Sequence, residues 1–184
     1  GFQVSSNLGV SVVWLFGRGN PSKKAAFRLY DTIGRQARAA VFFERLAVPD
    51  TIDGRFDLLL LHVFLALEAL KREQRGAALA KELVNVTFAG FDDALRQLGV
   101  SDFGMSRRIR AMADAFYGRL ESYSNALADP AKMRDAILRN VFRGDVAHEP
   151  AATLLAKYAL AAFVALEPGA LLQGDANFPP PPAE

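Results

Sequence analysis

The sequence predicts an all-α, single-domain bundle of about six helices with flexible N- and C-terminal tails. Apolar residues recur at spacings of three and four over most of the chain, as in helices with one buried face. Patterns of alternating polar and apolar residues, which would indicate strands, are almost absent. The chain has 184 residues, of which 51% are hydrophobic, so it suits one domain with a sizeable core.

The composition divides the chain into three parts. Residues 1–20 are rich in Ser and Gly and are expected to form a flexible N-terminal arm, part of which could be non-native sequence. Residues 21–168 carry the helical patterns and are predicted to form the domain. Residues 169–184 include four consecutive prolines and are expected to be an extended, mobile tail.

The first helix is predicted to begin at Asn20, a capping residue that is followed by Pro21 at the first helical position. Its apolar face continues to about Leu46, and Pro49 ends it because the residue before a proline disfavours helical geometry. The apolar positions of this face include Ala26, Leu29, Ile33, Ala37 and Ala40.

The second helix is predicted to be the central one. Asp50 or Asp53 can cap it, and the run from Phe56 to Leu70 is almost continuously apolar, which indicates burial on all sides. The run is too short for a membrane-spanning helix and contains charged residues. Gly76 interrupts the pattern before the third helix begins.

Four further helices follow. The third ends at Gly99, and the fourth carries one apolar stripe. Asp129-Pro130 opens the fifth helix, and Pro150 opens the sixth, which is rich in alanine and ends at Glu167-Pro168-Gly169. The stripe on the fourth helix consists of Ile109, Met112, Phe116, Leu120 and Tyr123.

No residues form a recognisable catalytic or metal-binding pattern, so the sequence predicts neither an enzyme nor a cofactor. The chain has no cysteine and two histidines that are far apart, His62 and His148. His62 is interpreted as a hydrogen-bonded core residue and His148 as a capping or exposed one. Asp92 and Asp93 are interpreted as a solvated acidic face. An enzyme using only carboxylates and arginine is the least favoured alternative.

Three arginines, Arg107, Arg108 and Arg110, are predicted to lie at the start of the fourth helix. Cations at that end oppose the helix dipole, but helix N-termini also bind anions, and arginines strengthen that tendency. The phosphates of RNA or of lipid headgroups would fit such a cluster. The structural alternative is pairing with Asp102, Asp114 or acidic residues of another helix. The formal net charge of +2 does not indicate a DNA-binding protein.

The N-terminal arm (residues 1–20) and the first helix offer a second candidate surface. The run from Val12 to Phe16 is apolar and includes Trp14, and Lys23 and Lys24 follow it. An aromatic, apolar segment beside lysines can bind a membrane surface. Docking of the arm on the domain's own surface explains the pattern equally well.

The junction between the first two helices combines charges, a proline and a glycine in one segment, residues 42–57. Opposite charges there can cap both helix ends and pair with each other, so the segment is interpreted mainly as a rigid corner. We call this segment the corner. Its main residues are Phe43, Glu44, Arg45, Pro49, Asp50, Asp53, Arg55 and Asp57.

The corner resembles the signature of the ubiquinol–cytochrome c chaperone family. Two further blocks agree with that family in order and spacing, so that the resemblance covers roughly residues 25–145. One runs from Leu95 to Asp102, and the other includes Tyr117 and Arg119, which join the arginine cluster as candidate partner-binding residues. Asp93, Gln97 and Ser101 depart from the pattern and bear on surface detail.

The resemblance implies a non-enzymatic assembly chaperone for the ubiquinol–cytochrome c reductase. Its partners would be newly made cytochrome b and, as further expectations, a ribosome or an anionic lipid surface and a small partner protein. Because the chain is short and shows no obvious transit peptide, we expect a bacterial member in the cytoplasm, peripheral to the inner membrane. The alternative is a general RNA- or anion-binding helical module.

Overall fold

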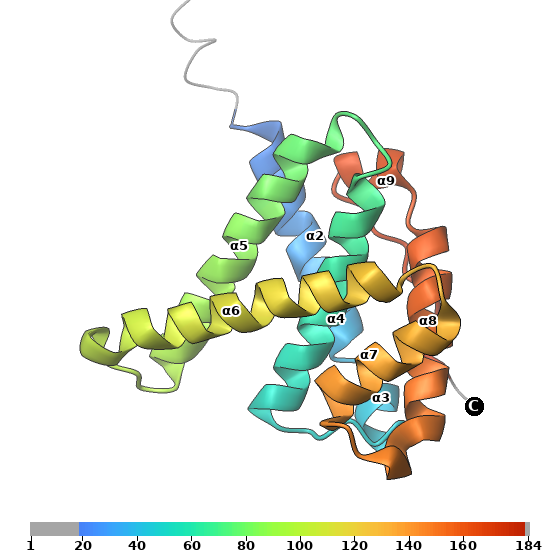
Figure 1. Cartoon of the computed structure of the whole chain (residues 1–184). Coiled ribbons are helices and arrows are strands. Elements are labelled where there is room, and N and C mark those ends of the chain that lie inside the picture. Colours follow the sequence, from blue (N-terminus) through green and yellow to red (C-terminus); the bar gives the residue numbers. More distant parts are fainter. Residues whose placement is uncertain (1–18, 183–184) are drawn as a thin grey trace, which may run out of the picture.

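The computed structural model describes residues 19–182, which fold into helices without a strand (Figure 1). Six long helices correspond to the six that the sequence predicts, and two five-residue helices and a 3-10 turn are added. The elements are α2 (Pro21–Ala37), α3 (Ala40–Glu44), α4 (Ile52–Leu70), α5 (Gly76–Gln97), α6 (Asp102–Ala126), α7 (Pro130–Phe142), η1 (Val146–His148), α8 (Glu149–Ala165) and α9 (Pro168–Leu172).

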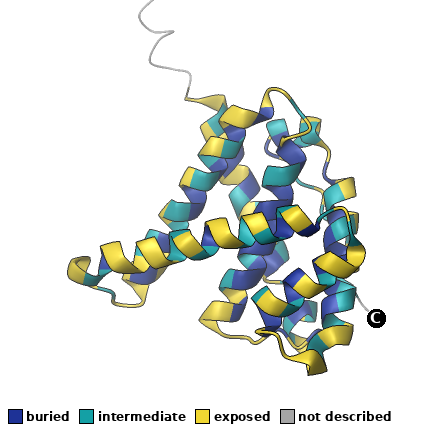
Figure 2. Cartoon of the chain, in the orientation of Figure 1, coloured by how far each residue is buried: buried dark blue, intermediate teal, exposed yellow. Residues whose placement is uncertain are grey.

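Helix α4 forms the centre of the core, as its apolar sequence predicts. Helices α2, α5, α6, α7, α8 and α9 all pack against it. Figure 2 shows most of α4 buried, apart from its exposed first turn, while the surrounding helices are exposed on their outer faces. Burial of an apolar helix on all sides is the main source of stability in such a bundle. Within residues 19–182, no helix is both long and apolar enough to cross a bilayer.

The first predicted helix is divided in two. Helix α2 ends at Ala37, and the chain turns at Arg38 and Ala39 before α3 begins. The turn directs Phe42 into the core, where its ring lies 5.5 Å from His62 and 5.4 Å from Tyr158. A continuous helix would not bury this ring, so tertiary packing overrides the local helical pattern.

The caps of the later helices follow the sequence prediction more closely. Asp129 accepts hydrogen bonds from the backbone N–H groups of Ala131 and Lys132 at the start of α7. Gly99 follows α5 and has a φ of 82°, which glycine adopts without strain. At the start of α4, however, the cap is neither Asp50 nor Asp53. It is Thr51, whose Oγ1 accepts the N–H of Gly54 at 3.1 Å.

The C-terminal segment differs in part from the expected extended, mobile tail. Residues 168–172 form α9, and Leu171 is fully buried. Residues 173–182 contain no helix, but Phe178 packs against His62 with their ring centroids 5.3 Å apart. The carbonyl oxygen of Pro179 accepts a hydrogen bond from Gln36 at 3.0 Å. The tail is docked because it covers apolar surface that α2, α4 and α8 leave open.

Helices α5 and α6 extend together beyond the rest of the bundle. Figure 1 shows their connected ends forming a projection on the left. We call residues 92–112 the arm, which is distinct from the N-terminal arm predicted for residues 1–20. Figure 2 shows mostly exposed residues at its tip, and the Phe103 side chain is 100% exposed. Residues from both helices of the arm line one wall of a concave surface.

Candidate functional site

A groove of about 1250 Å³ lies between α2, the start of α4, α5 and α6. Three large apolar side chains that line it are exposed to solvent: Phe27 by 55%, Ile52 by 63% and Leu98 by 56%. They come from three different elements and face one hollow. Exposed apolar side chains that are gathered in this way mark an interaction surface.

The floor of the groove is apolar and its rim carries charges of both signs. Phe56 and Phe91 pack in the floor with ring centroids 5.2 Å apart, beside Leu59 and Met112. Such a surface can hold an apolar helix or an extended segment, while the polar rim keeps the empty groove soluble. The charged lining residues are Asp31, Arg38, Asp53, Arg55 and Arg108.

The corner builds one end of this groove. Thr51 caps α4, so that Ile52, the first helical residue, points outward into the groove. Arg55 Nε lies 2.7 Å from Asp50 Oδ1, and this ion pair braces the turn. A Cβ at Gly54 would lie 1.9 Å from the carbonyl oxygen of Pro49, so this close approach requires glycine. The charges of the corner thus pair with each other in part, as the sequence predicts.

The other corner residues lie around this turn. Phe43 is half-buried, and the Arg55 guanidinium lies over its ring at 5.9 Å from the centroid. Glu44 and Arg45 are exposed at the end of α3, and Asp53 is in the first turn of α4. The negative charge of Asp53 is favourable there because it lies near the positive end of the helix dipole.

Asp57 differs from its neighbours because it pairs with residues outside the corner. Its side chain is 1% exposed, and its two oxygens lie 2.8 Å from Arg119 Nη2 of α6 and 2.9 Å from Arg143 Nη2. Arg143 ends α7 in a left-handed conformation, with a φ of 57°. One carboxylate therefore connects the start of α4 to α6 and to the end of α7.

This cluster buries charged and polar groups. Two guanidinium groups lie within 2.9 Å of the Asp57 carboxylate, and the buried Arg119 Nε and Tyr123 hydroxyl have no hydrogen-bond partner within residues 19–182. Burial raises the pKa of Asp57, against the opposite influence of Arg119 and Arg143. Burial also raises the pKa of Tyr123, and the nearby Asp57 charge acts in the same direction. The ion pairs hold three helices together at the cost of desolvating their charges.

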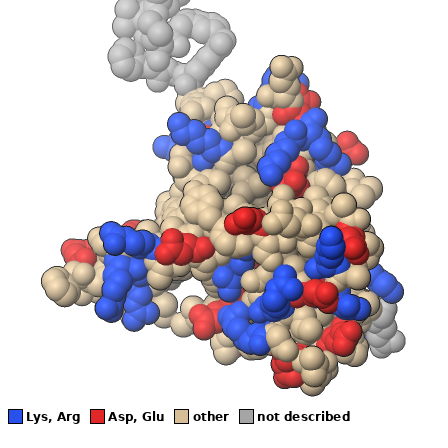
Figure 3. All heavy atoms as spheres, in the orientation of Figure 1, with Lys and Arg blue, Asp and Glu red and all other residues tan. Residues whose placement is uncertain are grey.

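The arginine cluster was predicted to lie at the start of its helix, but the structure places it further along. Helix α6 begins at Asp102, so Arg107, Arg108 and Arg110 come after its first turn, where the effect of the dipole has faded. All three side chains are exposed, and none has an ion pair with any residue in 19–182. Figure 3 shows Lys and Arg side chains gathered over this part of the arm. Only Arg108 lines the groove.

Two other predicted partner-binding residues have different surroundings. Arg119 is bound to Asp57 inside the fold, so it is not part of the exposed cluster. Tyr117 is 56% exposed, and its ring stacks on Phe88 at a centroid distance of 6.2 Å. In the predicted membrane-surface arm, Lys23 and Lys24 are exposed on α2. Trp14 and Phe16 lie outside the residues that the structure describes.

His62 is confirmed as a hydrogen-bonded core residue. Its Nδ1 lies 2.7 Å from the Leu58 carbonyl oxygen and its Nε2 lies 2.8 Å from the Tyr158 hydroxyl. Gln36 donates to that hydroxyl at 2.9 Å, so the hydroxyl is free to donate to His62 Nε2. Burial lowers the pKa of His62 to about 4 and raises the pKa of Tyr158 to about 12. The imidazole is therefore neutral near pH 7.

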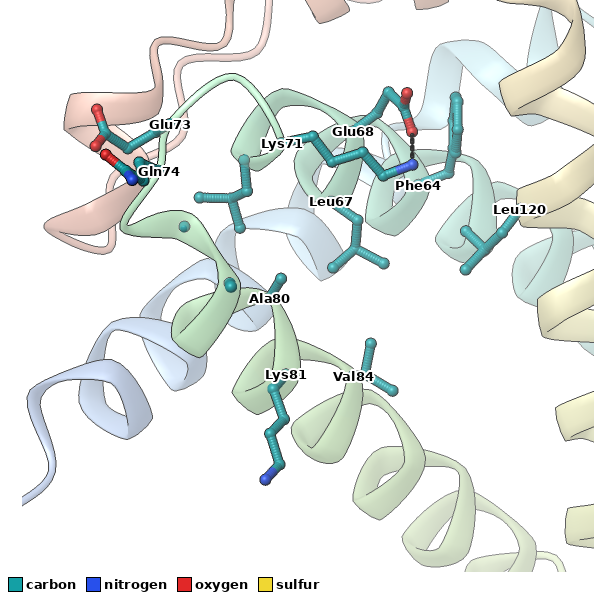
Figure 4. A pocket seen from close by; sticks show the side chains of 13 residues that line it. Phe64, Leu67, Glu68, Lys71, Glu73, Gln74, Ala80, Lys81, Val84 and Leu120 are labelled. Atoms are coloured by element: carbon teal, nitrogen blue, oxygen red, sulfur yellow. Dashed lines mark ion pairs between the residues drawn. The ribbon is translucent and has the colours of Figure 1, made fainter.

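A second hollow of about 530 Å³ lies between the end of α4, the start of α5 and α6 (Figure 4). Figure 4 shows Leu67, Val84 and Leu120 facing it, and Glu68 and Lys71 paired at its edge, 2.8 Å apart. The pair satisfies both charges within the protein. The described part of the chain contains no group of three or more His, Asp or Glu residues that could hold a metal ion.

The groove was not predicted from the sequence, although the residues that line it are apolar and charged types that the sequence shows. Phe27, Ile52 and Leu98 are apolar, and apolar residues next to a helical stripe are usually read as core. Their positions could have indicated exposure. Phe27 falls outside the spacing of the first apolar face, and Ile52 and Leu98 lie at helix ends. Only the fold shows that these three positions converge.

Comparison with known proteins gives a consistent result. A family model described as ubiquinol-cytochrome C chaperone matches residues 44–174. The chain is also 28% identical over 122 residues to ubiquinol-cytochrome c reductase complex assembly factor 1 of Mus musculus, which is 65% of this chain and 41% of that protein. The Xenopus laevis protein described in the same words is 26% identical over 121 residues, 65% of this chain and 60% of the relative. The matched region thus spans less than two thirds of either relative.

A solved structure is similar over nearly the whole chain. The crystal structure of the Cbp3 homolog from Brucella abortus superposes with a TM-score of 0.79 at 34% sequence identity. The similarity covers 92% of this chain and 97% of that one. The helical arrangement is therefore shared with a protein whose sequence is 34% identical.

Proposed function

The chain belongs to the ubiquinol–cytochrome c chaperone family, and from this membership we propose that it is a non-enzymatic assembly chaperone of the ubiquinol–cytochrome c reductase. The groove is the proposed client site. The observation that carries this proposal is the convergence of exposed Phe27, Ile52 and Leu98 on one apolar hollow.

The proposed client is an apolar segment of newly made cytochrome b. A membrane protein exposes apolar helices before insertion, and a groove with an apolar floor and a charged rim can shield one such segment. The groove is preferred over the second hollow because it is larger and its apolar side chains are more exposed. No cofactor is needed for this activity.

The proposed location is the bacterial cytoplasm, peripheral to the inner membrane, where cytochrome b is made and inserted. Binding near a ribosome and a small partner protein belong to the same proposal, and the resemblance to the family is their support. The exposed arginines of the arm would face an anionic surface at either location.

The test is site-specific photocrosslinking in cells that depend on the full chain. A photoreactive residue is placed at Ile52 or Leu98 in the groove, and at Val146 or Val164 as controls. The control side chains are 73% and 69% exposed and lie outside the groove. Cytochrome b peptides are expected from the groove positions and not from the controls. Equal capture at all four positions, or capture without cytochrome b, would refute the groove as the client site.

The second candidate function is a general RNA- or anion-binding module, and the unpaired Arg107, Arg108 and Arg110 favour it. RNA binding would weaken steeply with salt, because each neutralised phosphate releases counterions. If replacing the three arginines by Ala abolished RNA binding and left cytochrome b crosslinking and reductase levels unchanged, RNA binding would be a separate activity. If crosslinking also failed, the arginines would serve the client.

A further inference from the structure

The exposed face of the N-terminal half of α6 has a regular arrangement. Phe103, Arg107 and Arg110 follow at spacings of four and three, so their side chains share one side of the helix. All are exposed, and Phe103 is exposed over 100% of its side chain. The opposite side, with Met105 and Phe116, is buried against the fold. We call Phe103, Arg107 and Arg110 the tip face; Arg108 points to the groove instead.

We propose that the tip face is a docking surface for an anionic lipid bilayer. Phe103 would insert at the boundary between headgroups and acyl chains, and Arg107 and Arg110 would bind lipid phosphates. This inference deepens the membrane location proposed above and rests on it. It does not require the groove to bind a client.

The charges of the arm support an anionic partner at the tip. Arg96 is already bound to two carboxylates, with Asp92 and Asp102 each 2.8 Å from its nitrogens, so those acids do not neutralise the tip face. Asp114 lies on the same side of α6 beyond Arg110 and thus further from the tip. Arg107 and Arg110 have no ion pair among the described residues, so their charges are available.

The geometry favours a bilayer over RNA. Phe103 is the second residue of α6, and α6 begins at the end of the projection (Figure 1), so this exposed aromatic side chain can enter a flat interface that meets the tip. Arginine side chains one turn behind it can then reach back to the headgroups. RNA would also bind the arginines, but Phe103 would contribute to RNA binding only if a base stacked on its ring. RNA binding is therefore an outcome that the experiment distinguishes.

The experiment measures binding of the full chain to vesicles of phosphatidylcholine alone and of phosphatidylcholine with phosphatidylglycerol. The test variants are Arg107→Ala with Arg110→Ala, and Phe103→Ser. The matched control is Lys132→Ala with Arg139→Ala, which removes two exposed, unpaired charges from α7 of the described chain. Each arginine of the tip face contributes about fivefold, so the double variant should bind anionic vesicles about 25-fold more weakly. Phe103→Ser should weaken binding severalfold. The size of this loss should depend less on salt than the loss caused by removing the two arginines.

Three results would overturn the proposal. The first is equal binding to neutral and anionic vesicles, and the second is an equal loss in the α7 control. The third is an absence of vesicle binding together with arginine-dependent binding to an RNA oligonucleotide, which would assign the tip face to RNA. Photocrosslinking from Ile52 in the same variants separates this inference from the client groove. Unchanged crosslinking with lost vesicle binding supports two separate surfaces, whereas crosslinking that fails in the presence of vesicle binding refutes only the groove.

Discussion

The two halves of α6 hold arginines in opposite surroundings. In the C-terminal half, the Arg119 side chain is 17% exposed and lies 2.8 Å from the buried Asp57. In the N-terminal half, Arg107 and Arg110 are exposed and have no ion pair within the described part of the chain. The first arginine connects α6 to α4, and the other two are available to a partner. The same residue type on one helix thus serves the fold at one end and an external surface at the other.

The difference arises from what each half packs against. The C-terminal half crosses α4 and α7, so any charge on its inner side must be paired internally. The N-terminal half extends with α5 into the arm, where only one side is covered. Arginines on the opposite side remain in water. Substitutions at the two ends should therefore have different consequences, and their sizes test the comparison.

The largest effect is expected for Arg119→Met. The substitution leaves Asp57 buried with only Arg143 as its partner, and breaking a buried ion pair in this way should lower the free energy of unfolding by about 3 kcal/mol. Urea denaturation followed by circular dichroism measures the change. A loss below about 1 kcal/mol would show that Arg143 alone compensates for Asp57.

A double substitution separates the lost ion pair from lost packing. Asp57→Asn in the Arg119→Met background removes a buried carboxylate that has lost one of its two partners, so it should recover part of the lost stability. The same Asp57→Asn change in the wild-type background should instead be destabilising, because both arginines lose a negative partner. If Asp57→Asn had the same effect in both backgrounds, the two residues would not be coupled.

Acid should reveal the second buried polar site, His62. The pKa of His62 is about 4 in the folded state, below the value of 6.5 for an unperturbed histidine. The unfolded state therefore takes up a proton first as the pH falls, so the stability contributed by neutral His62 is full above pH 6.5 and is lost towards pH 4. Between pH 7 and pH 5 the loss should be about 2 kcal/mol.

The control for this pH dependence is His62→Gln, which cannot be protonated. Because Asp57 and other acids also titrate, the informative quantity is the difference between the wild type and His62→Gln at each pH, measured by urea denaturation. That difference should shrink as the pH falls from 7 to 5. A constant difference would mean that His62 keeps an ordinary pKa and is accessible to water.

A smaller effect is expected where the C-terminal segment covers His62. Phe178 is half-buried and packs its ring edge against the imidazole, so Phe178→Ala should cost about 1 kcal/mol of stability. Asn177→Ala next to it removes an exposed side chain and is the control. If both variants matched the wild type in urea denaturation, the segment would lie on the surface without stabilising it.

The contrast between these regions also shows what the sequence could predict. The burial of α4 followed from its continuous apolar run, and the pairing of Asp50 with Arg55 could be anticipated because both residues lie in one short corner. The N-terminal cap of α7 and the stop at Gly99 depended on local chemistry and were predicted correctly. Information of this kind is present within a few neighbouring residues.

Contacts between distant residues were not predictable. The sequence places Asp57 among the acidic residues near the start of a helix. Nothing near it in the sequence indicates Arg119 or Arg143 as its partners. The proline-rich composition suggests an extended tail but shows neither α9 nor the packing of Phe178 on His62. Likewise, nothing near Leu98 or Ile52 in the sequence shows that these apolar residues are exposed on one groove. These features depend on how helices are placed relative to one another.

The smallest effect is expected at the exposed end of α6. Arg107→Met with Arg110→Met makes the same chemical change as Arg119→Met, but it should alter the free energy of unfolding by less than about 0.5 kcal/mol, because neither arginine has an ion pair among residues 19–182. Urea denaturation at low and high salt measures this. A loss above about 1 kcal/mol that disappears at high salt would mean that the two arginines pair with Asp114 or another acid in solution. The tip face would then be structural, and the two halves of α6 would no longer differ in kind.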